Sequence, residues 1–110
     1  MGEAAEELVA RELVRRHYRI VGRNVAVGNL GELDIVARND KEVVIVEVRS
    51  RNGDEDPCES IGPAKRRRIR RTAAAYLLDR PIDYEEVRIF VGVVHFKEGD
   101  ADIKVIEDAF

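Results

Sequence analysis

The chain has 110 residues, 45% of them hydrophobic and 37% charged, and its formal net charge is −3; this length fits one domain over residues 1–110 that can bury a core without disulfides or metals. The acidic balance excludes a basic coat over the whole molecule, so nucleic-acid binding would need a local basic patch. The single cysteine excludes an internal disulfide, and because we see neither a signal peptide nor an apolar run of bilayer length, we expect a cytoplasmic protein with no membrane partner.

We expect a first helix over residues 3–16. Apolar residues recur at helical spacing between Ala5 and Leu13, acids crowd the first turn, and arginines close the last turn, as the helix dipole favours. On a helical wheel Glu6 falls close to the apolar face, whereas the other acids fall nearer its edges or beyond. Glu6 is therefore the acid of this helix that would point inward at a sheet. A carboxylate favoured by the dipole at a helix start is an equally good interpretation.

Three strands are expected next, at residues 18–27, 32–37 and 42–49. The turn sequence VGNLG separates the first two, and Asn39 with Asp40 makes a tight hairpin turn between the second and the third. The third strand is almost continuous in valine and isoleucine, which indicates burial on both faces. These strands predict an antiparallel meander.

A polar loop over residues 50–62 leads to a second helix, predicted over residues 63–78 because proline suits the first helical turn. A fourth apolar strand at residues 87–96 and a short edge strand at residues 102–106 follow. The helix between the third and fourth strands permits a parallel crossover pair. We therefore predict an α/β fold, with a mixed sheet flanked by helices.

Side chains alternate between the two faces of a strand, and this alternation puts an acid on an inner face of the third strand. Glu47 shares a face with Val43 and Ile45, and Arg49 follows on the same side. An acid in that place is costly to desolvate unless something pairs with it. Arg49 can pair with Glu47, or it can bind a phosphate.

The second strand holds Asp34 in a similar setting, between apolar neighbours. Alternation predicts Leu33 and Ile35 on one face and Asp34 on the other. In a hairpin of the second and third strands, Asp34 and Glu47 each lie six or seven residues from the turn and become neighbours. Two like charges so placed repel each other. A divalent cation relieves that repulsion, and Mg²⁺ favours carboxylates and waters.

The second helix concentrates positive charge. Its apolar residues Ile69, Ala73, Tyr76 and Leu77 recur at helical spacing and would face the sheet, so the cations spread over the remaining surface. Like charges at this spacing disfavour the isolated helix, and a phosphate backbone would relieve that cost. A solvated face balanced by the acidic loop at residues 54–59 is the alternative. The cations that we expect to bind nucleic acid are Lys65, Arg66, Arg67, Arg68, Arg70 and Arg71.

Several strings, in this order and spacing, resemble the YraN-like family. They are GELD, a hairpin, VEVRSR and a Pro–x–Lys–Arg-rich helix, preceded by AEELVARELVRRHYRIVGRN and followed by IEDAF. The resemblance covers nearly the whole chain. That family resembles the restriction-endonuclease-like superfamily with its PD-(D/E)xK nuclease core. The resemblance therefore implies an αβββαβ core. It also implies an endonuclease that uses Mg²⁺ or Mn²⁺ to cleave nucleic acid. The expected substrate is DNA, including branched or otherwise structured DNA.

Carried over by position, the resemblance makes Asp34 the core aspartate and Glu47 the second acid, with Arg49 in the place of the superfamily's lysine. Glu6 resembles the glutamate of the family's first helix, and Lys65 resembles the lysine that opens its second helix. The implied catalytic residues are Asp34, Glu47 and Arg49. The implied metal ligands are Glu6, Asp34, Glu47 and the backbone carbonyl of Val48.

Two positions depart from this pattern. Ala5 stands where the family usually has a glycine, and Arg49 replaces the lysine. Because arginine stays charged, Arg49 cannot be a general base at neutral pH, but it can orient the attacking water or stabilise charge on phosphorus. Since a fold does not fix a function, two alternatives remain: a non-catalytic nucleic-acid-binding module of nuclease fold, or a protein-interaction domain. The further partners to consider are a second copy of the chain, because many nucleases of this kind act as dimers, and a protein partner in DNA processing, which would supply the chemistry for a binding module.

Overall fold

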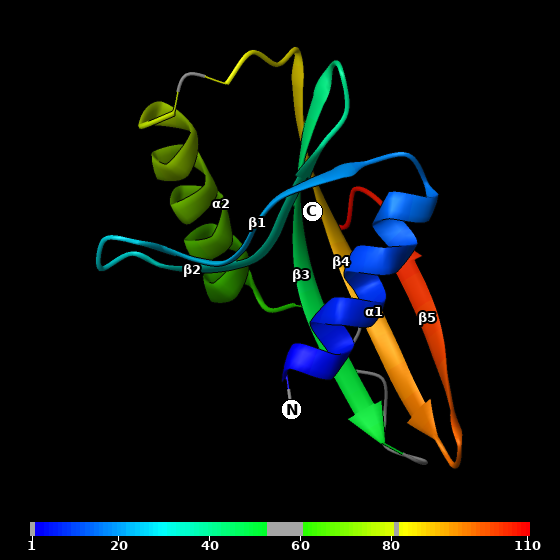
Figure 1. Cartoon of the computed structure of the whole chain (residues 1–110). Helices are drawn as coiled ribbons and strands as arrows, with labels where there is room; N and C mark the ends of the chain where they lie inside the picture. The colour runs from blue at the N-terminus through cyan, green and yellow to red at the C-terminus, as the bar shows by residue number, and fades with distance from the viewer. Residues whose placement is uncertain (1, 53–60, 81) are drawn as a thin grey trace.

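The computed structural model describes residues 2–52, 61–80 and 82–110, and it shows a mixed five-stranded sheet flanked by two helices (Figure 1). The α/β class is therefore confirmed. The predicted loop at residues 50–62 falls largely outside the described residues, and the third strand runs on to Asn52 instead of ending at Arg49. The elements in chain order are α1 (Gly2–Arg15), β1 (Arg19–Val27), β2 (Gly31–Arg38), β3 (Glu42–Asn52), α2 (Pro63–Leu78), β4 (Glu86–Lys97) and β5 (Asp100–Ile106).

The strands lie in the sheet in sequence order, β1-β2-β3-β4-β5. The pairs β1–β2, β2–β3 and β4–β5 are antiparallel, whereas β3 and β4 are parallel and joined through α2. Both the meander and the parallel crossover pair are as predicted. The side chain of Asn39 fixes the β2–β3 turn, because its Oδ1 accepts hydrogen bonds from the backbone N–H groups of Lys41 (2.9 Å) and Glu42 (2.7 Å).

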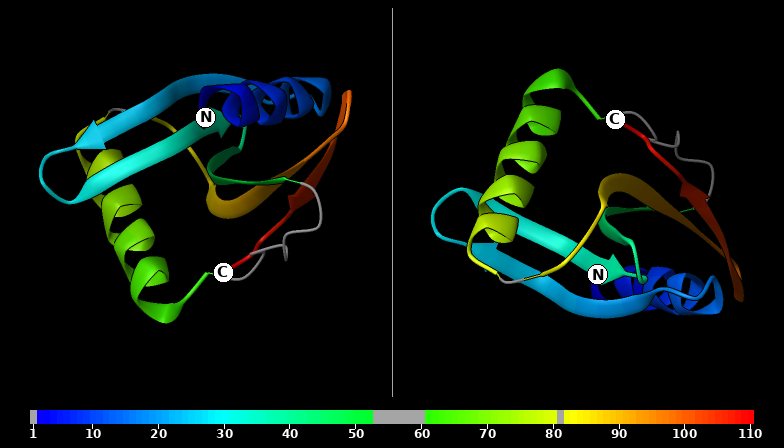
Figure 2. Two further views of the ribbon diagram at one scale, coloured as in Figure 1. Left: turned by 90° about the horizontal axis from the view of Figure 1, so that it is seen from below. Right: turned by 90° about the horizontal axis from the view of Figure 1, so that it is seen from above.

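The sheet buries both of its faces, each against one helix (Figure 2). Val9 and Leu13 of α1 lie in one core, and Ile69 and Tyr76 of α2 lie in the other. The run of apolar residues in β3 serves both cores, as predicted. Its contributions are Val43 and Ile45 on the α2 side and Val44 and Val46 on the α1 side. Among the described residues, no helix is long and apolar enough to cross a bilayer.

The start of β2 separates from β3 and bends towards α2. β2 pairs with β3 only from Ile35 to Arg38, whereas its earlier residues pair with β1 alone. A Cβ atom at Gly31 would lie 3.2 Å from Oγ1 of Thr72, so the β2 backbone lies directly against α2 there. The prediction that Leu33 and Ile35 share a face is wrong. Leu33 lies in the α2-side core and Ile35 in the α1-side core, because β2 bends away from β3 between them.

Candidate functional site

Asp34 and Glu47 lie beside each other at the point where β2 leaves β3. The last backbone pair of the two strands at this end is Ile35 with Val46, and one further step in the same register brings Asp34 opposite Glu47. Backbone pairing stops there. Asp34 Oδ2 instead accepts a hydrogen bond of 2.8 Å from the backbone N–H of Val48. The structure thus brings the two predicted acids together, and it uses one of them to satisfy the β3 backbone where the neighbouring strand departs.

The Glu47 carboxylate is buried, and the positive charges near it offset the cost of its burial only in part. Glu47 is 7% exposed, and burial raises its pKa. The negative charge of Asp34 raises this pKa further, while Lys65 and Arg49 act in the opposite direction. Lys65 Nζ lies 3.3 Å from Glu47 Oε1. Because the balance of these effects is a raised pKa, the nearby cations do not fully offset desolvation and repulsion.

Arg49 lies on the Glu47 side of β3 and has an unused donor. Its Nε is buried and has no hydrogen-bond partner among the described residues. Of the two roles open to Arg49, no ion pair with Glu47 forms among the described residues, where the partner of Glu47 is Lys65. The charge of Arg49 still acts to lower the pKa of Glu47. A buried donor without an acceptor is costly, so this Nε has a hydrogen bond to give that no described residue accepts.

Glu47 opens into a pocket of about 240 Å³ between α2 and the bent part of β2. Lys65 and Arg68 of α2 share this pocket with Glu47. Glu32 and Thr72 line it as well, and neither was predicted, although the helical spacing of Thr72 from Lys65 and Arg68 is a usable signal. The described lining residues are Leu30, Gly31, Glu32, Glu47, Lys65, Arg68, Ile69 and Thr72.

Glu6 points inward, as the helical wheel predicts, and is 7% exposed. Its Oε1 accepts a hydrogen bond of 2.9 Å from Nδ2 of Asn24 on β1. Within residues 2–52, 61–80 and 82–110, no three Asp, Glu, His or Cys side chains gather closely enough to hold a metal ion. The structure therefore brings Asp34 and Glu47 together but leaves Glu6 with Asn24, outside any group of three carboxylates in the described part of the chain.

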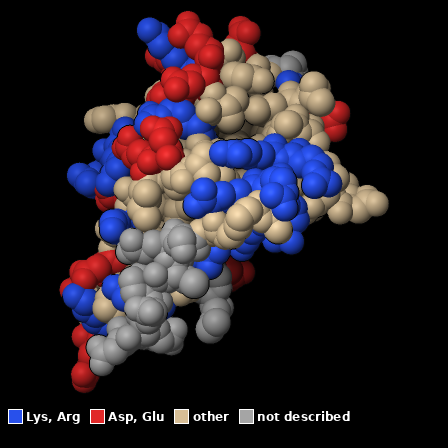
Figure 3. All heavy atoms as spheres, turned by 180° about the vertical axis from the view of Figure 1, so that it is seen from behind, with Lys and Arg blue, Asp and Glu red and all other residues tan. Residues whose placement is uncertain are grey.

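The first half of α2 forms a basic face. Lys65 is engaged by Glu47, but in the described part of the chain none of the arginines of this helix forms an ion pair. Lysine and arginine side chains gather on this side of the molecule (Figure 3). The acidic loop at residues 54–59, which was the alternative source of balance, lies outside the described residues. The cations of the basic face are Lys65, Arg66, Arg67, Arg68, Arg70 and Arg71.

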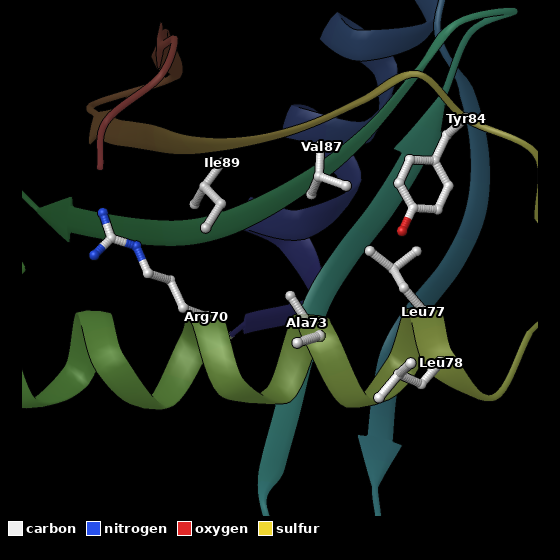
Figure 4. Close-up of a pocket in the computed structure, with 8 residues that line it drawn as sticks. Arg70, Ala73, Leu77, Leu78, Tyr84, Val87 and Ile89 are labelled. Atoms are coloured by element: carbon white, nitrogen blue, oxygen red, sulfur yellow. The ribbon is translucent and has the colours of Figure 1, made fainter.

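A second pocket, of about 440 Å³, lies on the other flank of α2, between that helix and β4. Arg70 lies at one end of it, and Leu77, Leu78 and Tyr84 lie at the other (Figure 4). Arg70 is the only charged side chain among the described residues that line it. The described lining of this apolar pocket includes no acid, in contrast to the pocket of Glu47.

Fold and site together define a small α/β protein in which two carboxylates meet beside a basic helix. The model of the uncharacterised protein family UPF0102 matches residues 5–98. The chain belongs to this family, which confirms the YraN-like resemblance. The match includes every candidate site residue, from Glu6 to Arg71.

Relatives that bear the same family name align with this chain over most of their length. A UPF0102 protein of Syntrophotalea carbinolica is 36% identical over 112 residues, which cover 100% of this chain and 90% of the relative. One of Thermotoga neapolitana is 40% identical over 99 residues, covering 86% and 92%. One of Syntrophus aciditrophicus is 35% identical over 111 residues, covering 99% and 87%. The names of these relatives state a family and no activity.

Proposed function

We propose that the protein is a metal-dependent nuclease of the restriction-endonuclease-like type, which hydrolyses phosphodiester bonds in nucleic acid, DNA in the first place. The observation that carries this proposal is the meeting of Asp34 and Glu47 beside a helix whose arginines lack carboxylate partners among the described residues. The element order from α1 to β4, with β5 added, supports the proposal, because the family resemblance implies an αβββαβ core.

The two carboxylates suit Mg²⁺ or Mn²⁺. Mg²⁺ is commonly bound by one or two carboxylates while it keeps several waters, so a pair of acids is a sufficient protein contribution. A divalent cation between Asp34 and Glu47 would offset their repulsion and lower the raised pKa of Glu47. The Val48 carbonyl is a further donor next to Glu47. Glu6 has the weakest support as a ligand, because its carboxylate bonds Asn24.

The chain's own residues bind and orient the substrate in this proposal. A bound ion would supply Lewis acidity and a more acidic water. Arg49 follows Glu47 on β3, and the Nε of its guanidinium has no acceptor among the described residues. Its charge would stabilise negative charge on a phosphate, without exchanging a proton. Lys65 and Arg68 line the same pocket as Glu47 and can donate to the same phosphate. The basic face holds the phosphate backbone without reading sequence.

The test is a cleavage panel of single-stranded, duplex, flap and four-way DNA, with matching RNA, in Mg²⁺, Mn²⁺ or EDTA. The control is the nearly isosteric double variant Asp34→Asn plus Glu47→Gln. We expect metal-dependent products from the wild type and a loss on the order of 100-fold or more in the variant. Absence of cleavage on every substrate, or equal cleavage by the variant, would contradict the proposal.

A non-catalytic nucleic-acid-binding module is the second candidate, and the Lys65–Glu47 ion pair favours it. Lys65 already supplies Glu47 with a counter-charge at 3.3 Å, so the acid pair can exist without a metal. Calorimetric titration of Mn²⁺ separates the two candidates. Heat of binding that disappears in the double variant supports the nuclease. DNA binding without metal binding supports the module.

A further inference from the structure

The residues after β5 fold back across β4 to α2 and are held firmly there. The backbone N–H of Ala109 donates to the carbonyl of Ile89 at 2.9 Å. The Arg88 guanidinium donates to Glu107 at 2.9 Å and to Asp108 at 2.7 and 2.9 Å. Asp108 has φ 51°, a left-handed conformation that aspartate tolerates better than most residues. These contacts fix where the chain arrives on α2.

Phe110 arrives at the basic face and contacts two of its arginines. The guanidinium carbon of Arg66 lies 5.4 Å from the centre of the Phe110 ring, and that of Arg70 lies 5.6 Å from it. The ring also packs against the α2-side core. Residues four apart on a helix lie one above the other, so a single ring reaches both cations. Neither arginine forms an ion pair among the described residues, although Arg66 Nε donates to the Ile61 carbonyl at 2.6 Å.

This contact orders the arginines without using up their charge. A cation–π contact leaves the charge of a guanidinium in place. Among the described residues the only donor of these two guanidinium groups in use is the Arg66 Nε, which bonds the Ile61 carbonyl, so the others can bind an anion. Two neighbouring guanidinium groups match the oxygens of a phosphate well. Long side chains lose conformational freedom when they bind a ligand, and a ring that already holds them reduces that loss. The arrangement therefore favours binding of a phosphate.

We propose that Arg66 and Arg70 form a phosphate clamp and that Phe110 is its positioning residue. The ligand is a backbone phosphate of nucleic acid. The inference rests on the nucleic-acid substrate of the proposed function, but not on hydrolysis or on a metal. At 3.6 residues per turn the clamp lies on the opposite flank of α2 from Lys65 and Arg68. It would thus hold a different phosphate from the one beside Glu47.

The test measures duplex DNA affinity by fluorescence anisotropy in EDTA. Phe110→Leu keeps an apolar side chain and removes the aromatic face, whereas Phe110→Tyr keeps both. We expect Phe110→Leu to weaken binding about two- to fivefold and Phe110→Tyr to restore it to the wild-type value. In an Arg66→Ala plus Arg70→Ala background, Phe110→Leu should cause no further loss. In the matched background Arg67→Ala plus Arg71→Ala, which removes the same charge, it should keep its full effect.

Three results would overturn the clamp: equal affinities of wild type and Phe110→Leu, the same loss in both arginine backgrounds, or no duplex binding by the wild type. Absence of cleavage in the nuclease assay leaves the clamp standing, because binding is measured in EDTA. If thermal melts show that Phe110→Leu is unfolded, NMR of the wild type replaces it. The Nε–Hε signals of Arg66 and Arg70 should then shift on addition of duplex DNA, and unchanged signals would contradict the clamp.

Discussion

Glu47 has an acidic side chain that the fold buries away from most of the water. The charge of Asp34 is next to it, and both effects raise its pKa, while Lys65 and Arg49 oppose them only in part. Such an acid is not explained by stability, because an apolar or amide side chain would cost less there. A buried carboxyl with a perturbed pKa in a pocket that also holds cations is a feature typical of functional sites.

The raised pKa of Glu47 predicts how the stability of the protein depends on pH. The folded protein holds the Glu47 proton more tightly than the unfolded chain does. As pH rises from the ordinary glutamate pKa through the raised one, Glu47 therefore lowers the free energy of unfolding. Without metal, Glu47→Gln should therefore melt above the wild type near about pH 7, and the difference should shrink towards about pH 4. Thermal melts in EDTA measure it. A variant that melts below the wild type at neutral pH would show that the Lys65–Glu47 pair outweighs burial.

At the scale of elements, the separation of β2 from β3 creates the site. While the strands run together their backbone groups pair, and where they part, Asp34 takes over as the acceptor for the Val48 N–H. The bend carries Gly31 against Thr72 of α2, which closes the pocket of Glu47 on one side. The hydrogen bond of Asp34 and the wall of the pocket that faces α2 therefore share one structural cause.

Two substitutions of Asp34 separate its structural role from a role in metal binding. Both Asp34→Ala and Asp34→Asn remove the charge that raises the pKa of Glu47, but only asparagine keeps an acceptor for the Val48 N–H. We expect alanine to destabilise the protein by about 1–3 kcal/mol more than asparagine. Urea denaturation in EDTA measures the difference. Equal stability of the two variants would mean that the hydrogen bond contributes little. Both variants should lose metal-dependent cleavage alike.

At the scale of the whole molecule, a net charge of −3 coexists with one strongly basic helix face (Figure 3). Many cations elsewhere are paired within the protein, as Arg11 is with Glu7 and Arg15 with Glu12. The cations of the basic face other than Lys65 have no such partners among the described residues. Five arginines that have no carboxylate partner in the described part of the chain thus lie on one helix, beside the acid pair.

This asymmetry predicts the salt dependence of DNA binding. Replacing Arg67 and Arg71 by alanine should lower the slope of log affinity against log salt by roughly 0.9 for each phosphate that the variant no longer neutralises. Replacing Arg11 and Arg15 by alanine, which removes the same charge from α1, should leave the slope unchanged. Anisotropy titrations across a salt series measure both slopes. A flat response of the wild type, or equal effects of the two double variants, would favour a protein-interaction domain.

Several features of the molecule follow from the sequence alone, because they depend on short-range periodicity. Alternation along β3 and the short β2–β3 turn make Asp34 and Glu47 neighbours, and helical spacing turns Glu6 inward and spreads the cations of α2 over its surface. The element order and the mixed sheet follow from the same patterns. Each of these inferences links residues within one element or across one tight turn, where local geometry leaves few alternatives.

Only the tertiary structure decided which groups these residues meet. The bend of β2 moved Leu33 to the α2-side core, and the place of β1 gave Glu6 its partner Asn24. The return of the chain after β5 set Phe110 under Arg66 and Arg70. These contacts join segments far apart in the sequence. They depend on how the sheet twists and bends, and the spacing of residues along a strand or helix does not encode that geometry.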